Sequence, residues 1–144
     1  TNNPPFEYHR MNMNNYMNLT TESPQNRFAD RLDLKPYAQG MGAMGLPGDA
    51  SSASRFVRAA FLKWNSVAPE EEKANVSQFF HILDSVAMVR GSVVTDQGTY
   101  DITTYSCCAN ARTGVYYYKT YDDSRVRAVD MHETDLDGNV LIQR

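Results

Sequence analysis

The spacing of apolar residues changes from helical to alternating after Gly91. Residues 51–66 and 69–91 place apolar residues three and four positions apart, which predicts two amphipathic helices. Polar residues at 49–52 and the Pro-Glu-Glu-Glu run at 69–72 suit the two helix starts. The expected buried stripes are Ala53, Phe56, Val57, Ala60, Phe61 and Trp64 in the first helix, and Val76, Phe79, Phe80 and Leu83 in the second.

The last third of the chain holds three short runs rich in β-branched and aromatic residues. They are residues 99–108, 114–121 and 125–131, and the turn formers NARTG and DDS separate them. This pattern predicts an antiparallel meander. Helices packed on an antiparallel sheet give the α+β fold class.

Three further segments carry weaker signals. Residues 4–19 predict a helix begun by proline, with Tyr8 and Met11 near one side. Residues 20–37 mix turn formers with charges and are long for a structureless loop, which indicates a functional segment or one that reaches another chain. The glycines of GMGAMGLPGD lack the spacing of a phosphate loop, so they predict close backbone packing in a strand that runs into a turn.

Composition excludes several classes of function. The 144 residues carry a formal net charge of -3 without any run of Lys or Arg, so no nucleic-acid partner is expected. No stretch approaches the roughly 20 apolar residues of a membrane span. Cys107 and Cys108 are adjacent and form no zinc quartet with the scattered histidines, so we expect packing thiols in a reducing, cytoplasmic setting and neither metal nor cofactor.

Two residues are not explained by local rules. Arg55 lies in the first turn of the 51–66 helix, where a cation opposes the helix dipole at a cost of up to about 1 kcal/mol. It either pairs with Asp49 or meets water, or it is held against a buried anion or a thiolate whose charged form it favours. Asn2 is either a loop asparagine bonded to its own backbone or a carboxamide donor to a developing oxyanion.

Three segments together carry a resemblance that spans nearly the whole chain. They are TNNPPFEYHRMNMNNYMNL, then KPYAQGMGAMGLPGDASSASRFVRAAFLKWNSV with VSQFFHIL, and TTYSCCANARTGVYYYKTYDDSRVRAVDM. They resemble the C-terminal half of the choloylglycine hydrolase family, which contains bile salt hydrolases and penicillin V acylases. The resemblance implies a four-layer αββα fold of N-terminal nucleophile hydrolases, in which a cysteine exposed by processing attacks an amide carbonyl.

The family's motifs give roles to individual residues of this chain. The TNNP asparagine that serves the oxyanion hole corresponds to Asn2, and the arginine beside the nucleophilic sulfur corresponds to Arg55. Thr1 matches an interior threonine of that motif, although some N-terminal nucleophile enzymes do use threonine. Cys107 and Cys108 match a structural strand, so the nucleophilic cysteine is expected in an N-terminal half that this chain lacks.

The resemblance also sets expectations for the whole protein. Residues 1–144 would be the C-terminal portion of one domain, inactive alone, and residues 20–37 would embrace a neighbouring subunit of a bacterial cytoplasmic homotetramer. The expected reaction is hydrolysis of glycine- or taurine-conjugated bile salts. The alternatives are a penicillin V acylase and a non-catalytic assembly fragment.

Overall fold

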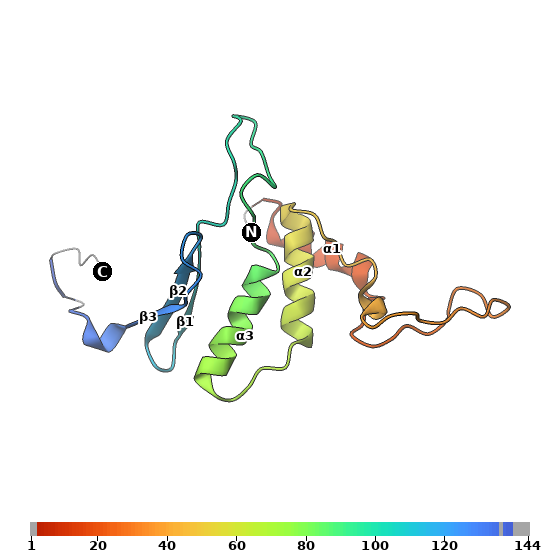
Figure 1. The fold of residues 1–144 in the computed structure, drawn as a ribbon, viewed down its shortest axis with the longest axis horizontal. Coiled ribbons are helices and arrows are strands. Elements are labelled where there is room, and N and C mark those ends of the chain that lie inside the picture. The colour runs from red at the N-terminus through yellow and green to blue at the C-terminus, as the bar shows by residue number, and fades with distance from the viewer. Residues whose placement is uncertain (1–2, 136, 140–144) are drawn as a thin grey trace. The chain divides into compact units, whose positions relative to one another are not determined.

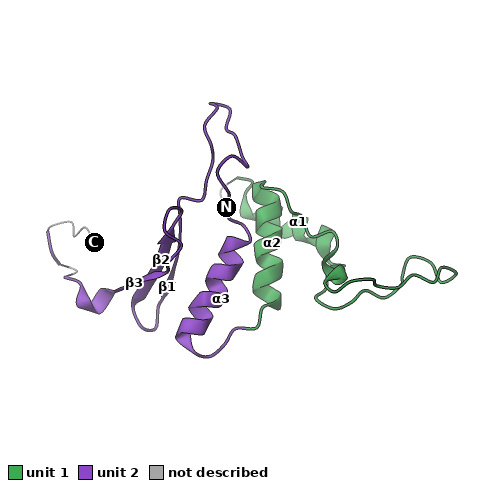
Figure 2. Ribbon diagram, in the orientation of Figure 1, with its two compact units in different colours: residues 1–67 green, residues 68–144 purple. Residues whose placement is uncertain are grey.

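The computed structural model describes residues 3–135 and 137–139, and Figure 1 shows their helices and strands. The chain separates into a first unit, Thr1–Val67, and a second unit, Ala68–Arg144 (Figure 2). No helix within the described residues has the length and apolar content that a membrane crossing needs.

The first unit contains helix α1, Phe6–Asn12, which continues as a 3-10 turn at Met13–Tyr16. The predicted helix over residues 4–19 is therefore present but shorter. Asparagines interrupt it, because their side chains bond nearby groups and have low helix propensity. The amide of Asn14, for example, donates to the carbonyl of Met11 at 2.8 Å.

The buried side of α1 differs from the expected one. Tyr8 and Met11 are 44% and 69% exposed, whereas His9 is fully buried. The His9 ring stacks on Phe56 with centroids 4.5 Å apart, so the contact with a second helix decides which face is covered. Helical spacing within α1 could not supply that information.

Helix α2, Ser52–Asn65, confirms the helix predicted at residues 51–66. Ser51 is its N-cap, and its side chain accepts a hydrogen bond from the backbone N–H of Ser54. Val57, in the expected stripe, is buried at 3% exposure. The prediction that Trp64 is buried is wrong, because this residue, next to the last of the helix, is 78% exposed.

The strand expected within residues 40–49 is wrong. Met41–Ala43 forms a 3-10 turn instead, entered through Gly40 with a φ of 80°. The close backbone packing expected of these glycines is present at buried Gly42, whose carbonyl accepts from the N–H of Thr20 at 3.0 Å. A 3-10 turn brings the chain against residue 20 without a strand ladder.

The second unit begins with helix α3, Glu72–Asp84, which confirms the second predicted helix but ends earlier than residue 91. The carboxylate of Glu71 caps it by accepting from two backbone N–H groups, those of Lys73 and Ala74. Phe80 is buried at 3% exposure. His81 is exposed, as expected.

Strands β1 (Tyr105–Asn110), β2 (Val115–Thr120) and β3 (Arg127–Asp130) form an antiparallel sheet in the order β1-β2-β3. This confirms the meander and the α+β class. The strand prediction for residues 99–104 is wrong apart from an isolated bridge between Val94 and Tyr100. There the chain forms a local turn at Gly98, whose φ is 75°.

One face of the sheet meets α3. Residues directly opposite in an antiparallel pair share a face, so Cys108 and Tyr117 lie on one side and Cys107 and Tyr118 on the other. The first side is tied to the helix by Tyr117 and by Lys119, which forms an ion pair with Asp84. The opposite side carries exposed aromatic residues, including Tyr105 at 60% exposure.

Candidate active site

The start of α2 is built around the carboxylate of Asp49. Its Oδ1 accepts from the backbone N–H of Ser51 at 2.9 Å, and its Oδ2 accepts from the hydroxyl of Ser54 at 2.5 Å. The hydroxyls of Ser51 and Ser54 lie 3.1 Å apart. Hydrogen bonds from Ser51 and then from Ser54 lower the pKa of Asp49 to about 2, so this carboxylate is ionised at neutral pH.

A second set of bonds ties the preceding loop to the same helix. One guanidinium nitrogen of Arg58 donates to the backbone carbonyl of Pro47 at 2.6 Å and to that of Asp49 at 3.3 Å. The loop that carries Asp49 is therefore held both at the cap and about two turns further along α2. These contacts fix the direction in which the first turn of the helix leaves the loop.

Arg55 follows Ser54 in this first turn and is partly buried. Its Nε is buried without a hydrogen-bond partner, and none of the ion pairs among the described residues includes Arg55. Asp49 instead uses its oxygens on Ser51 and Ser54. The interpretation that Arg55 pairs with Asp49 is therefore wrong.

The N-terminal segment is attached close to Arg55. The hydroxyl of Ser52, the first residue of α2, donates to the carbonyl of Asn3 at 3.0 Å across 49 positions of sequence. Asn2 and Thr1 lie outside the described residues. The structure therefore brings the residue next to Asn2 to the helix turn that carries Arg55.

His9 is a residue of this region that the sequence did not single out. Its ring lies fully buried against Phe56, the neighbour of Arg55, and neither ring nitrogen has a hydrogen-bond partner. Tyr8 meets the same ring edge-on at 5.7 Å. A histidine without a motif around it gives no sequence signal of burial, because that depends on the packing of α1 on α2.

The cysteines of the second unit have the surroundings of packing residues. Cys107 and Cys108 are free thiols, each partly buried. Burial and then the neighbouring Cys107 raise the pKa of Cys108, which is opposite to the shift that an activated thiol needs. A hydrogen bond with Cys107 is the first cause that raises the pKa of Tyr116 to about 12.

A polar cluster joins α3 to the turn between β1 and β2. The carboxylate of Glu72 accepts from the hydroxyl of Tyr117 at 2.7 Å and from that of Thr113 at 3.1 Å. Hydrogen bonds from Tyr117 and then from Asn110 lower the pKa of Glu72, and the bond to Glu72 raises the pKa of Tyr117. These contacts satisfy one another and hold the hairpin on the helix.

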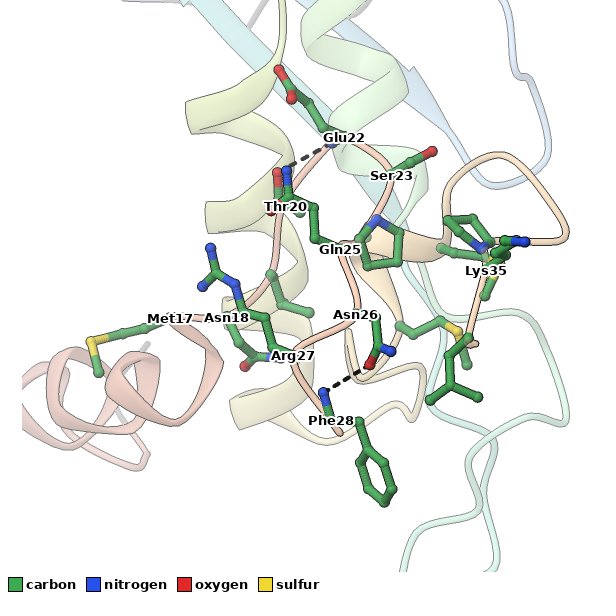
Figure 3. A pocket seen from close by; sticks show the side chains of 17 residues that line it. Met17, Asn18, Thr20, Glu22, Ser23, Gln25, Asn26, Arg27, Phe28 and Lys35 are labelled. Atoms are coloured by element: carbon green, nitrogen blue, oxygen red, sulfur yellow. Dashed lines mark hydrogen bonds between the residues drawn. The ribbon is translucent and has the colours of Figure 1, made fainter. Parts of the chain in front are cut away.

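An open groove of about 800 Å³ lies along the 20–37 segment in the first unit (Figure 3). Figure 3 shows the backbone N–H groups of Glu22 and Phe28 bonded to the side-chain oxygens of Thr20 and Asn26. The amide of Asn26 also donates to the carbonyls of Ala29 and Leu32, so one asparagine organises the end of the segment. The groove is lined by residues 17–20, 22–28 and 34–36 together with Met41, Gly42 and Met44.

Metal ligation finds no support in the part of the chain that the structure describes. No three side chains of His, Cys, Asp or Glu gather there closely enough to hold a metal ion. The groups at the start of α2 are the guanidinium of Arg55, the hydroxyls of three serines and the backbone carbonyl of Asn3, which is bonded to Ser52.

Comparison with known proteins covers almost the whole chain. Residues 1–143 match the family of linear amide C–N hydrolases called the choloylglycine hydrolase family. The chain is 50% identical over 142 residues to a bile salt hydrolase/transferase of Lactiplantibacillus plantarum, covering 99% of this chain and 44% of that protein. It is 41% identical over 142 residues to a bile salt hydrolase/transferase of Clostridium perfringens, covering 98% of this chain and 43% of that protein.

Solved structures agree with these relatives. A mutant of the conjugated bile acid hydrolase from Clostridium perfringens superposes with a TM-score of 0.80 at 41% identity, covering 95% of this chain and 42% of that one. The penicillin V acylase from Agrobacterium tumefaciens has a TM-score of 0.68 at 19% identity, covering 94% of this chain and 36% of that one, and shares the fold alone.

The chain thus spans less than half the length of the curated relatives it matches. Its helices and antiparallel sheet are part of the α+β fold of N-terminal nucleophile hydrolases that these neighbours share. Since the family match extends from residue 1 to residue 143, the chain belongs to the choloylglycine hydrolase family of linear amide C–N hydrolases.

Proposed function

We propose that this chain supplies the oxyanion donor and the thiol-supporting cation of an enzyme that hydrolyses glycine- or taurine-conjugated bile salts. The single observation that carries the proposal is the bond between Ser52 and Asn3, which joins the segment of Asn2 to the helix turn of Arg55. The 50% identity to a bile salt hydrolase/transferase favours this substrate class.

The proposed reaction is acyl transfer through a thioester. A cysteine thiolate attacks the amide carbonyl, and its own α-amino group serves as the base that takes the thiol proton and returns it to the leaving amine. Arg55 favours the thiolate over the thiol by its charge. The carboxamide NH₂ of Asn2 donates to the oxyanion that forms on the carbonyl oxygen, and water then hydrolyses the thioester.

The nucleophile in this proposal lies outside the 144 residues. Cys108 is a poor candidate because its pKa is raised, and Cys107 lies beside it on strand β1, partly buried. Thr1 belongs to the TNNP motif. We therefore regard residues 1–144 as the C-terminal portion of a single hydrolase domain that is inactive without its N-terminal half.

The 20–37 segment is proposed to embrace a neighbouring subunit of a homotetramer. Phe28 and Tyr37 are each 83% exposed, and Leu32 and Leu34 are each 48% exposed. Such a group of apolar side chains on an extended segment is typical of an interaction surface. In Figure 1 the segment extends away from α1 and α2 of its own unit.

Penicillin V acylase is the second candidate function, supported by the shared fold. In the complete enzyme, we expect faster turnover of glycocholate or taurocholate than of penicillin V, and the reverse order would exchange the two candidates. A non-catalytic assembly fragment is the third. Mass spectrometry of the native protein should find a companion segment or longer chain that begins with cysteine, and a lone 144-residue species would support the fragment.

Two variants test the assigned residues in the complete enzyme. Arg55→Ala should raise the pH at which the nucleophilic thiol becomes reactive toward iodoacetamide. Asn2→Ala should lower kcat by on the order of 10²–10³, with a much smaller change in KM. A defect confined to KM would remove Asn2 from the oxyanion hole.

Free thiols and bacterial relatives favour the bacterial cytoplasm as the setting.

A further inference from the structure

We infer that Asp49 is a positioning residue for Arg55, which it orients through Ser51 and Ser54 without pairing with it. This inference rests on the proposed function, since it assigns Asp49 a task in the support of the same thiol. Asp49 does not touch the reacting atoms. It acts on the first turn of α2.

Asp49 bonds to two serines and forms no ion pair with Arg55. A carboxylate close to an arginine commonly forms a bidentate pair with it. Here Oδ1 is taken by the N–H of Ser51 and Oδ2 by the hydroxyl of Ser54. A carboxylate paired with Arg55 would offset the positive charge that the thiolate needs, and no ion pair among the described residues joins Asp49 to Arg55.

The same bonds fix the backbone immediately before Arg55. Ser54 is 7% exposed, and its N–H donates to the hydroxyl of the N-cap Ser51 at 3.3 Å. The N–H of Arg55 in turn donates to the carbonyl of Ser51 at 3.0 Å. Asp49 therefore holds both ends of the turn from which the Arg55 side chain leaves.

Arg58 secures Asp49 from the other side. Its guanidinium donates to the carbonyl of Asp49 and to that of Pro47, so the loop cannot shift along α2 without losing these bonds. Arg55 itself has a buried Nε without a hydrogen-bond partner. The backbone from which the Arg55 side chain leaves is the part that Asp49 holds, through its bonds to Ser51 and Ser54.

A double-mutant cycle in the complete enzyme tests this inference. The variants are Asp49→Ala, Arg55→Ala and the double variant, and the readout is the pH dependence of thiol alkylation by iodoacetamide. We expect Asp49→Ala to raise the alkylation midpoint by no more than Arg55→Ala does, and to have no further effect once Arg55 is absent. We also expect kcat on a conjugated bile salt to fall by on the order of 10- to 100-fold, because a displacement of ~1 Å near the chemistry can cost about 10²-fold.

Two further variants separate positioning from general loss of stability. In Asp49→Asn the amide oxygen can still accept from the N–H of Ser51, but the NH₂ group replaces the oxygen that accepts from the hydroxyl of Ser54. We therefore expect a shift of the alkylation midpoint between those of the unmodified enzyme and Asp49→Ala. Asp123→Asn removes another carboxylate with several hydrogen bonds, those from Arg125 and Arg127 in the second unit, and should leave the alkylation midpoint unchanged. Asp49→Asn also serves as the test if Asp49→Ala fails to fold.

The outcomes distinguish the inference from the proposed function. If Arg55→Ala shifts the midpoint but neither Asp49 variant does, the positioning role is overturned and the proposed function stands. If Asp49→Ala shifts the midpoint equally with and without Arg55, Asp49 acts by another route and the inference is again overturned. If Arg55→Ala leaves the midpoint unchanged, the thiol-supporting role of Arg55 fails, and the role of Asp49 fails with it.

Discussion

Gly42 is the position where the smallest side chain should have the largest structural effect. A Cβ atom there would lie 2.0 Å from the carbonyl oxygen of Glu22 and 2.6 Å from that of Thr20, whereas real Cβ atoms essentially never approach within 3.0 Å. Both obstacles are backbone, so they cannot turn aside. Gly42→Ala must therefore separate the turn Met41–Ala43 from the start of the 20–37 segment by about 1 Å or more.

The cost follows from the contacts that this separation breaks. Overpacking of a well-packed site costs about 1–3 kcal/mol. The bond between the N–H of Thr20 and the carbonyl of Gly42, 3.0 Å long, contributes about 1 kcal/mol more. The reduced freedom of alanine in the unfolded chain returns about 0.4–1 kcal/mol. We expect the free energy of unfolding to fall by about 2–3 kcal/mol.

Urea unfolding of the complete protein measures this change, and Gly48→Ala is its matched control. A Cβ at Gly48 meets nothing within 4 Å, and the backbone there lacks a left-handed φ. Gly48→Ala should leave stability within about 0.5 kcal/mol or raise it slightly. Equal unfolding free energies for the two alanine variants would refute the argument from close backbone packing.

Gly42→Ala carries a second expectation for assembly. If the 20–37 segment holds a neighbouring subunit, loosening its base should weaken the oligomer, which light scattering after size-exclusion chromatography would report as a lower mass at micromolar concentration. Gly48→Ala should retain the mass of the unmodified protein. If Gly42→Ala is destabilised but its oligomer keeps the same mass, the 20–37 segment does not take part in assembly.

Three other predictions concern stability of the complete protein and use urea unfolding. Phe80→Ala should cost about 3–5 kcal/mol because Phe80 is 3% exposed, while Phe79→Ala, at 41% exposure, should cost clearly less; similar losses would contradict the assignment of the core. His9→Phe should raise the free energy of unfolding by about 1 kcal/mol, because it keeps the stack on Phe56 and removes two buried nitrogens without partners. The control His81→Phe, on the surface, should not raise it. A loss of stability in His9→Phe would show that the imidazole has a partner. The pKa of Asp49 is lowered from 3.8 to about 2, so its hydrogen bonds stabilise the fold above pH 3.8 and lose that effect as the pH falls to about 2. The free energy of unfolding of Asp49→Asn should therefore decline less steeply than that of the unmodified protein across this pH window. Parallel curves of unfolding free energy against pH would contradict the reasoning.

The elements that sequence predicted well are those fixed by neighbours along the chain. Helix α2 has its cap, its stripe and its end within 15 residues, so periodicity and capping preferences place it nearly to the residue. The helix predicted over residues 69–91 is longer than α3, because the end of a helix depends on side-chain bonds to the backbone more than on the spacing of apolar residues. Ser85, for instance, donates its hydroxyl to the carbonyl of Ile82 as the helix ends.

The errors lie where distant segments meet. The glycines of residues 40–49 predict a strand that runs into a turn, yet the chain forms a 3-10 turn there because Gly42 approaches the backbone of Thr20 and Glu22. The burial of His9 is decided by Phe56, which is 47 residues away in sequence. Neither contact leaves a periodic signal in the segment that contains it.

The candidate site shows the same division. Arg55 could be singled out because a cation in the first turn of a helix violates a local rule. Asp49 could be named only as a possible cap or as a partner of Arg55, since its bond to the buried hydroxyl of Ser54 depends on how the loop returns over the helix. The attachment of Asn3 to Ser52 spans 49 positions and could not be predicted from spacing.

The exposed apolar side chains fall into two groups that call for different partners. Tyr105 and Tyr116, 60% and 37% exposed, stand on the sheet face away from α3, where a flat aromatic surface suits another layer of the same domain. Phe28 and Tyr37, each 83% exposed, lie on the 20–37 segment of the first unit. The chain spans less than half the length of its relatives, so the first group is consistent with the proposal that residues 1–144 are part of a larger domain, and the second with the proposed contact to a neighbouring subunit. Burial of each group would be favoured by the hydrophobic effect, and the two groups lie in different units of the chain. The close packing at Gly42 holds the base of the 20–37 segment and so bears on the second group alone.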